Sequence, residues 1–218
     1  MTKLAPRAFG WLITLTALVG VVLAGLMTGR MLEQYDDNIG FAQEADQIAT
    51  VLNLHPGMNV GDIRAGLGRW TVDMAQRIGP DGQVYATAGP NPPHDLMATI
   101  AAAGIDNISV ITRTPADTPR LPLGCCDAIL VRAVYHHFED PAQLLSSLAR
   151  NLRPNGTVLI IEFDEGTPEQ LGGHGISRSA VRRDAVNAGF EVVQETGDWH
   201  GNAYAMLLRR RDPLDPNH

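Results

Sequence analysis

The strongest constraint on the fold is the alternation of short apolar segments with helical segments after residue 40. The apolar segments have the length of buried strands, and the segments between them repeat apolar residues at helical spacing. Strands are expected over residues 58–63, 84–87, 108–112, 126–132, 157–163, 191–194 and 204–209, and helices over residues 41–54, 70–78, 95–103, 141–152 and 177–188. This alternation predicts an α/β domain with a parallel sheet, in which one of the last two strands runs antiparallel because no helix separates them.

The composition is that of one domain with an appendage. The chain has 218 residues, of which 44% are hydrophobic and 19% charged, so it can bury a core. Its formal net charge of −7 argues against nucleic acid as a partner, because phosphate backbones bind basic surfaces. Cysteine and histidine do not occur at spacings typical of a zinc site, so no metal is expected.

The two cysteines, Cys125 and Cys126, are adjacent in the sequence. Neighbouring residues rarely reach the geometry that a disulfide needs. We therefore expect no disulfide between them.

The N-terminal region contains a run of 22 residues, 8–29, without a charged side chain. In a helix this run is roughly 33 Å long, which is enough to cross the hydrocarbon core of a bilayer. The sequence therefore predicts a transmembrane anchor over residues 1–30, a polar connector over 31–40 and a folded domain over 41–218.

A cleaved signal peptide is the alternative, with Val22-Leu23-Ala24 as its cleavage site. The apolar run exceeds the roughly 7–15 residues of a signal peptide, which favours the anchor. Lys3 and Arg7 precede the run and acidic residues follow it. This charge bias favours a cytoplasmic N-terminus in the inner membrane of a bacterium, with the domain in the periplasm.

Small residues recur at intervals of four along the predicted span. One row consists of Thr16, Gly20, Ala24 and Thr28, and Gly25 with Gly29 lies beside it. Such rows allow close approach of a second helix, which predicts a transmembrane protein partner in addition to the lipid bilayer. The alternative is that glycine and alanine are simply common in membrane helices.

Two longer blocks resemble the class I S-adenosylmethionine-dependent methyltransferases. Residues 54–87 contain a strand, a glycine-rich turn, a helix, a Gly-Pro-Asp-Gly turn and a second strand. Residues 121–163 are similar to the fourth and fifth strands of that family, joined through the segment YHHFEDP. The resemblance implies a Rossmann-like, doubly wound sheet of seven strands, preceded here by the transmembrane helix.

The resemblance also implies a cofactor site at the carboxyl ends of the strands. If the chain retains S-adenosylmethionine, the implied cofactor-binding residues are Asp62, Gly66, Gly68, Asp117, Arg132 and His136. Glycines allow the backbone to approach the cofactor, and the following helix offers its free amides. No catalytic residue is assigned, because methyl transfer depends mainly on the positioning of donor and acceptor.

The sequence departs from the family pattern at two positions. Arg64 stands where the family has the first glycine of its turn, and its long cationic side chain could fill the place of the cofactor. Ala88 stands where the family has an acidic residue that binds the ribose hydroxyls. Both departures predict weak or absent cofactor binding.

Several polar residues near the strand ends admit two interpretations. These residues are His136, His137, Glu162, Asp164, His174 and Arg178. In one interpretation they bind cofactor or substrate in the crevice. In the other they have structural roles, in which they pack against the sheet, cap turns or face solvent. Trp199-His200-Gly201 is interpreted as a turn between the last two strands, without chemistry.

Two functions fit the sequence. The first is a non-catalytic accessory subunit of a membrane complex, with no cofactor, which explains Arg64, Ala88 and the anchor. The alternative is an active methyltransferase that acts at the membrane on a small or lipid-like acceptor. A third possibility, a binding module that uses the old crevice for another ligand, has no feature of the sequence in its favour.

Overall fold

The computed structural model describes residues 40–89, 93–112, 118–166, 175–200 and 203–211. The chain divides into two compact units between Glu44 and Ala45. In the first unit, residues 40–44 are helical; the second unit carries the sheet. The predicted anchor, 1–30, lies outside the described residues. Within the described residues, no helix has the length and apolar character needed to cross a membrane.

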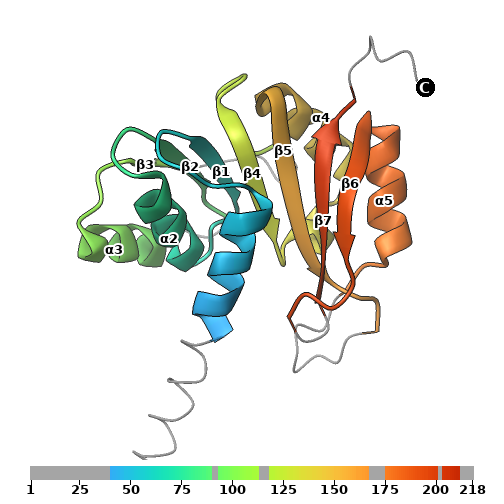
Figure 1. Cartoon of the computed structure of the whole chain (residues 1–218), viewed down its shortest axis with the longest axis horizontal. Coiled ribbons are helices and arrows are strands. Elements are labelled where there is room, and N and C mark those ends of the chain that lie inside the picture. Colours follow the sequence, from blue (N-terminus) through green and yellow to red (C-terminus); the bar gives the residue numbers. More distant parts are fainter. Residues whose placement is uncertain (1–39, 90–92, 113–117, 167–174, 201–202, 212–218) are drawn as a thin grey trace, which may run out of the picture. The chain divides into compact units, whose positions relative to one another are not determined.

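The second unit contains one sheet of seven strands (Figure 1). The strands lie in the order β3-β2-β1-β4-β5-β7-β6. Their bounds are β1 (Asn59–Ile63), β2 (Gln83–Thr87), β3 (Ile108–Ile111), β4 (Cys126–Arg132), β5 (Leu152–Phe163), β6 (Phe190–Thr196) and β7 (Ala203–Arg210).

The sheet is mostly parallel, as the alternating pattern predicted. β1 pairs in parallel with β2 and β4, and the outer pairs β2–β3 and β4–β5 are also parallel. β7 lies between β5 and β6 and is antiparallel to both. The prediction that one of the last two strands reverses direction is confirmed.

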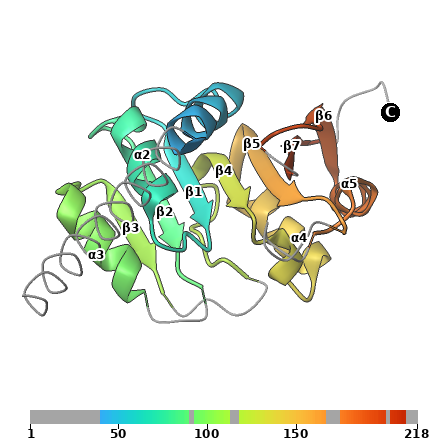
Figure 2. The ribbon, with the colours of Figure 1, turned by 90° about the horizontal axis from the view of Figure 1, so that it is seen from below.

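Helices cover both faces of the sheet (Figure 2). On one face, α2 (Arg69–Ile78) and the helix that ends at residue 51 pack on apolar residues of β1, β2 and β4, and α3 (His94–Ala103) packs on Ala86. On the other face lie α4 (Pro141–Asn151) and α5 (Arg178–Asn187). The strands are buried from both sides, which explains why they read as continuous apolar runs.

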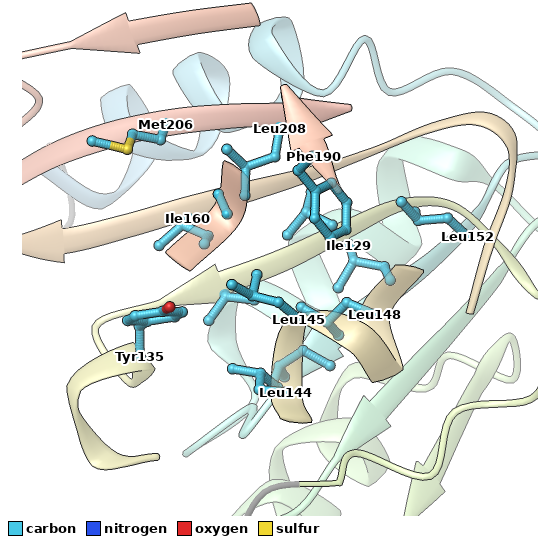
Figure 3. Close-up of a cluster of buried hydrophobic side chains, with 14 of the residues drawn as sticks. Ile129, Tyr135, Leu144, Leu145, Leu148, Leu152, Ile160, Phe190, Met206 and Leu208 are labelled. Atoms are coloured by element: carbon cyan, nitrogen blue, oxygen red, sulfur yellow. The ribbon is translucent and has the colours of Figure 1, made fainter. Parts of the chain in front are cut away.

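The α4–α5 face holds the three largest fully buried side chains, Tyr135, Tyr204 and Phe190. Figure 3 shows part of this cluster. Leu144, Leu145 and Leu148 of α4 lie against Ile129 of β4 and Phe190 at the start of β6, and all five are fully buried. The apolar spacing of α4 places these leucines on one side of the helix. Asp140 begins the helix by accepting a hydrogen bond from the Gln143 amide at 2.9 Å.

The observed elements agree with the predicted ones to within three residues at their described ends, except at β5. That strand begins at Leu152 and not at residue 157, because Leu152 already pairs with Cys126 ahead of an irregularity in the register. Asn155, in the Pro-Asn-Gly segment, adopts a positive φ of 65°. The predicted strand, 157–163, left this segment outside, and the structure places it within β5.

The expectation about the cysteines is wrong. Cys125 and Cys126 form a disulfide, with 3.7 Å between their Cα atoms. The pair lies where β4 begins, after Gly124 with its φ of +58°, and just before the β4–β5 register shifts. In a regular strand, neighbouring side chains point to opposite faces, so the two sulfur atoms could not meet. The backbone is irregular at the start of β4, and this irregularity could not be predicted from the spacing of the cysteines.

Candidate ligand site at the carboxyl ends of the strands

The turn after β1 is built from residues with left-handed backbone conformation. Arg64, Gly66 and Gly68 have φ values of +54°, +56° and +84°. The turn is tied to the end of β2, because the Arg64 amide donates to the Thr87 hydroxyl at 2.8 Å and the Ala65 amide donates to the Thr87 carbonyl at 2.9 Å. The turn therefore forms although Arg64 replaces a glycine, at a cost of about 1 kcal/mol for its backbone conformation.

Asp62, the last but one residue of β1, is buried beneath this turn. Its carboxylate accepts a hydrogen bond from the Thr71 hydroxyl at 2.5 Å. Burial raises the pKa of Asp62 to about 6, against the lowering effects of the Thr71 hydrogen bond and of the Arg132 charge. Asp62 thus anchors the first turn of α2 from below.

The Arg64 side chain lies across the end of the crevice between β1 and β4. Its Nη1 donates to the His137 carbonyl at 3.4 Å, and its guanidinium carbon is 4.1 Å from the centre of the Phe138 ring. His137 belongs to a short 3₁₀ turn, η1 (Tyr135–His137), which follows β4. Because β1 and β4 are neighbours, one arginine links the turns that follow both strands.

Arg132, the last residue of β4, stacks on Trp70 of α2, with 4.4 Å between its guanidinium carbon and the ring centre. Both residues line a cavity of about 300 Å³, formed mainly by the turn after β1. Three of the described lining residues are arginines, namely Arg64, Arg69 and Arg132, and one, Asp62, is acidic. The lining carries an excess of positive charge when Asp62 is ionised.

His136 and Glu162 meet beside this cavity. His136 Nδ1 lies 2.9 Å from Glu162 Oε2 in a close contact that is not aligned as a hydrogen bond, and the His136 amide donates to the same oxygen at 3.3 Å. Glu162 is fully buried at the end of β5 and also accepts from the Phe163 amide at 2.9 Å. The pair joins the ends of β4 and β5.

Asp164 and Arg178 form a second link at this edge. Arg178 Nη2 lies 2.5 Å from Asp164 Oδ2 and donates to the Gly197 carbonyl at 3.1 Å. The arginine thereby connects α5 with the segment after β5 and with the connection between β6 and β7. This arrangement favours the structural interpretation of both residues.

Ala88 follows β2, where the family pattern has its ribose-binding carboxylate. The residue is buried, and its amide donates to the Ile111 carbonyl at 2.9 Å. Its methyl group cannot accept a hydrogen bond from a ribose hydroxyl.

The structure brings four of the six predicted cofactor-binding residues to one cavity: Asp62, Gly66, Gly68 and Arg132. His136 lies in the adjoining η1 turn, held by Glu162. Asp117 and His174 lie outside the described residues. Trp199, interpreted as part of a turn, is buried in the core on the α2 face.

Sequence reasoning missed Trp70, Thr71 and Phe138. Trp70 and Phe138 each lie under an arginine of the cavity, and Thr71 holds Asp62. Trp70 and Thr71 follow the glycine-rich turn directly, so the helix geometry after Gly68 could have placed them at the site. Phe138 had no such signal, because its contact with Arg64 spans 74 positions of the sequence.

A larger hollow, of about 480 Å³, lies at the opposite edge of the sheet. Its lining includes Gln83 at the start of β2 and Asn107 just before β3. Ligands of open α/β sheets bind at the carboxyl ends of the strands, so this hollow is not the candidate site despite its size.

The strand order, the reversed β7 and the crevice between β1 and β4 together define a Rossmann-like methyltransferase fold. A solved S-adenosylmethionine-dependent methyltransferase from Aquifex aeolicus has the same fold, with a TM-score of 0.66 at 20% identity; the match covers 77% of this chain and 89% of that one.

Sequence comparison points to the same family. The family model for the methyltransferase domain matches residues 62–160. A ubiquinone/menaquinone biosynthesis C-methyltransferase, UbiE, from Bordetella avium is 27% identical over 117 residues, which is 51% of this chain and 43% of the relative. Nocamycin O-methyltransferase from Saccharothrix syringae is 29% identical over 119 residues, or 54% of this chain and 42% of the relative.

The matched segment is thus similar to S-adenosylmethionine-dependent methyltransferases, and the chain as a whole shares their fold. The chain spans less than half the length of these two curated relatives, since the matches cover 43% and 42% of them. The family implies S-adenosylmethionine as the cofactor if the domain is active.

The residues of the crevice do not fit S-adenosylmethionine. The Arg64 side chain crosses from the turn after β1 to the turn after β4, Ala88 offers no side-chain acceptor to a ribose, and the described lining of the cavity includes three arginines. The sulfonium of the cofactor is itself a cation, and like charges at close range in a partly desolvated site repel.

Proposed function

We propose that this chain is a non-catalytic member of the methyltransferase fold, which serves as an accessory subunit of a membrane complex. The observation that carries the proposal is the position of Arg64. Its guanidinium lies 4.1 Å from the Phe138 ring and donates to the His137 carbonyl, so it links the two turns between which the cofactor of an active relative would lie.

The loss of the acidic residue at the end of β2 supports the same conclusion. A hydrogen bond to a charged partner is worth roughly 1.5–3 kcal/mol, and its absence at Ala88 weakens a ribose contact by about ten- to a hundredfold. Thr87, which directly precedes Ala88, accepts a hydrogen bond from the Arg64 amide. Both departures therefore act on the same crevice.

The membrane part of the proposal rests on the sequence. Residues 8–29 form the anchor, the N-terminus lies in the cytoplasm and the domain lies in the periplasm, away from the compartment in which S-adenosylmethionine is made. The rows Thr16/Gly20/Ala24/Thr28 and Gly25/Gly29 provide the face for a transmembrane partner. A reporter that works only in the periplasm, fused after His218, is expected to be active. Activity of a cytoplasm-only reporter at that place contradicts this topology.

The test of the cofactor site is calorimetric titration of the full chain, in one mild detergent, with S-adenosylmethionine. The native chain is expected to bind no tighter than about 1 mM. The double variant Arg64→Gly, Ala88→Glu opens the crevice, restores a ribose acceptor and is expected to bind at least tenfold tighter, which corresponds to about 1.4 kcal/mol.

Arg120→Gly is the matched control. Arg120 also has a positive φ, +51°, but is not among the described residues that line the cavity. Like Arg64→Gly, this control removes the strain of a positive φ at a non-glycine residue, but it does not open the crevice. It is therefore expected to leave cofactor affinity unchanged. Micromolar binding by the native chain overturns the proposal.

The second candidate is an active methyltransferase at the membrane with a small or lipid-like acceptor. It is favoured by the retained cavity, in which Gly66 and Gly68 keep the backbone conformation of a cofactor-binding turn. The likeness to a ubiquinone/menaquinone biosynthesis C-methyltransferase supports a lipid-like acceptor for this candidate. The test is to incubate the native chain with labelled S-adenosylmethionine and a membrane extract. Transfer of the labelled methyl group to the extract would support the active methyltransferase.

A further inference from the structure

Two exposed apolar side chains lie at the edge of the sheet where the parallel strands end. Leu67 is 67% exposed in the turn after β1, and Met97 is 52% exposed in the first turn of α3, the helix that follows β2. Single apolar side chains are common on protein surfaces, whereas neighbouring ones mark contact surfaces. The position of these two residues relative to each other therefore matters.

Leu67 and Met97 are brought together by the contact between the turn and α3. A Cβ added to Gly68 would lie 3.7 Å from Leu96 Cα. Because consecutive Cα atoms are about 3.8 Å apart, the Cα atoms of Leu67 and Met97 are at most about 13 Å apart. We call these two side chains the apolar rim, since Leu67 also lines the cavity of about 300 Å³.

The chain enters the sheet-bearing unit from the same edge. Asp46, in the helix that ends at residue 51, pairs with Arg77 in the last turn of α2 at 2.7 Å. The segment 52–58 then leads to the start of β1. The helix therefore runs in the direction opposite to β1, and its beginning in this unit, at Ala45, is nearer the edge at which β1 ends.

The predicted anchor limits how far this edge can lie from the bilayer. The 15 residues 30–44 separate the end of the apolar run, at residue 29, from Ala45. Fully extended, they span at most roughly 50 Å. A surface tethered this closely meets the bilayer at a high effective concentration, so a contact too weak for a free protein becomes populated. Two apolar side chains can then suffice, although a small apolar insertion by itself binds membranes only marginally and reversibly.

We propose that the apolar rim docks on the surface of the lipid bilayer to which the chain is anchored. The inference rests on the anchor of the proposed function and adds an orientation of the domain, in which the cavity lined by Leu67 faces the lipid headgroups. Leucine and methionine suit this contact because they insert apolar surface without a polar group, and the unbranched methionine adapts to an irregular surface.

The test uses the full chain reconstituted in vesicles of phosphatidylethanolamine and phosphatidylglycerol. Leu67→Cys and Met97→Cys are labelled, one at a time, with the environment-sensitive fluorophore NBD; Cys125 and Cys126 are joined in a disulfide and do not react with the label. Nitroxide-labelled lipid is expected to quench NBD at both positions at least about threefold more strongly than NBD at Leu123→Cys. Leu123 is the matched control, because it is 77% exposed and precedes β4, at the opposite edge of the sheet.

A second pair of variants tests the apolar character of the rim. Met97→Glu, added to the labelled Leu67→Cys chain, places a charge in the rim and is expected to reduce quenching by about threefold, because a carboxylate resists transfer into lipid. Val186→Glu changes an equally apolar side chain, 40% exposed on α5, and is expected to leave quenching unchanged.

Equal quenching at the three labelled positions overturns the inference, and so does unchanged quenching in Met97→Glu. Protection of the rim in native membranes but not in the pure lipid vesicles also overturns it, because the occupant is then a protein. Flotation of the vesicles distinguishes docking from anchoring. A chain that alkaline carbonate removes from the vesicles overturns the anchor of the proposed function, whereas an anchored chain without quenching at the rim overturns the docking alone.

Discussion

Asp62 was predicted to bind the cofactor, but in the structure it stabilises the turn after β1. Its carboxylate lies under the turn after β1, bonded to Thr71 at 2.5 Å, and burial raises its pKa to about 6 from an ordinary value of 3.8. A raised folded-state pKa means that the folded chain binds a proton more tightly than the unfolded chain does. The free energy of unfolding therefore falls as the pH rises from about 4 to about 6.

Asp62→Asn removes this cost while its amide oxygen still accepts the Thr71 hydrogen bond. At pH 7 the variant is expected to exceed the native chain in free energy of unfolding by up to roughly 3 kcal/mol, and at pH 4 the difference is expected to vanish. Urea denaturation of both chains at the two pH values measures it. Asp81→Asn, at an exposed carboxylate, serves as the control. A difference of equal size at both pH values contradicts the assignment to Asp62.

At the scale of the elements, the turn before α2 lies in close contact with α3. A Cβ added to Gly68, whose φ is +84°, would lie 2.6 Å from Leu96 Cδ1, and Leu96 of α3 is buried. Gly66 has a similar φ, +56°, but an added Cβ would meet nothing within 4 Å. Both glycines provide backbone freedom, and only Gly68 also provides room for helix packing.

Gly68→Ala and Gly66→Ala form a matched pair. Gly66→Ala is expected to lower the free energy of unfolding by about 1 kcal/mol, from backbone conformation alone. Gly68→Ala adds overpacking against Leu96 and is expected to cost roughly 2–4 kcal/mol. Thermal and urea denaturation compare the two. Equal losses of unfolding free energy in the two variants would show that α3 moves to accommodate the new methyl group and that the contact with Leu96 does not affect stability.

At the scale of the whole domain, one sheet joins two cores. Leu130 of β4 belongs to the cluster beneath α2, and Leu145 of α4 belongs to the cluster on the opposite face. Because adjacent residues of a strand point to opposite faces, β4 contributes to both clusters along its length. The two cores are therefore expected to unfold together.

Leu130→Ala and Leu145→Ala test this coupling, since both side chains are fully buried. Each variant is expected to lose about 2–5 kcal/mol and to unfold in a single transition. Leu123→Ala is the control, because Leu123 is 77% exposed and its loss is expected to stay within about 0.5 kcal/mol. Two separate transitions in either core variant would refute the coupling of the two faces.

The order and type of the helices and strands could be predicted from the amino-acid sequence. Apolar runs between helical segments require a parallel sheet, since both faces of such strands are buried, and the last two strands lack a crossover helix. The glycine-rich turn also identified the position of the cavity, because positive φ values favour glycine and two glycines remain at Gly66 and Gly68.

The contacts between side chains that are distant in the sequence could not be predicted and depend on the folded chain. Arg64 reaches Phe138, Arg132 stacks on Trp70 and Glu162 holds His136, and each contact depends on which strands are neighbours in the sheet. The disulfide between Cys125 and Cys126 likewise depends on the irregular start of β4. Local pattern specifies an element through the backbone preferences of nearby residues, whereas the charge and shape of a site come from side chains that the fold assembles from separate elements.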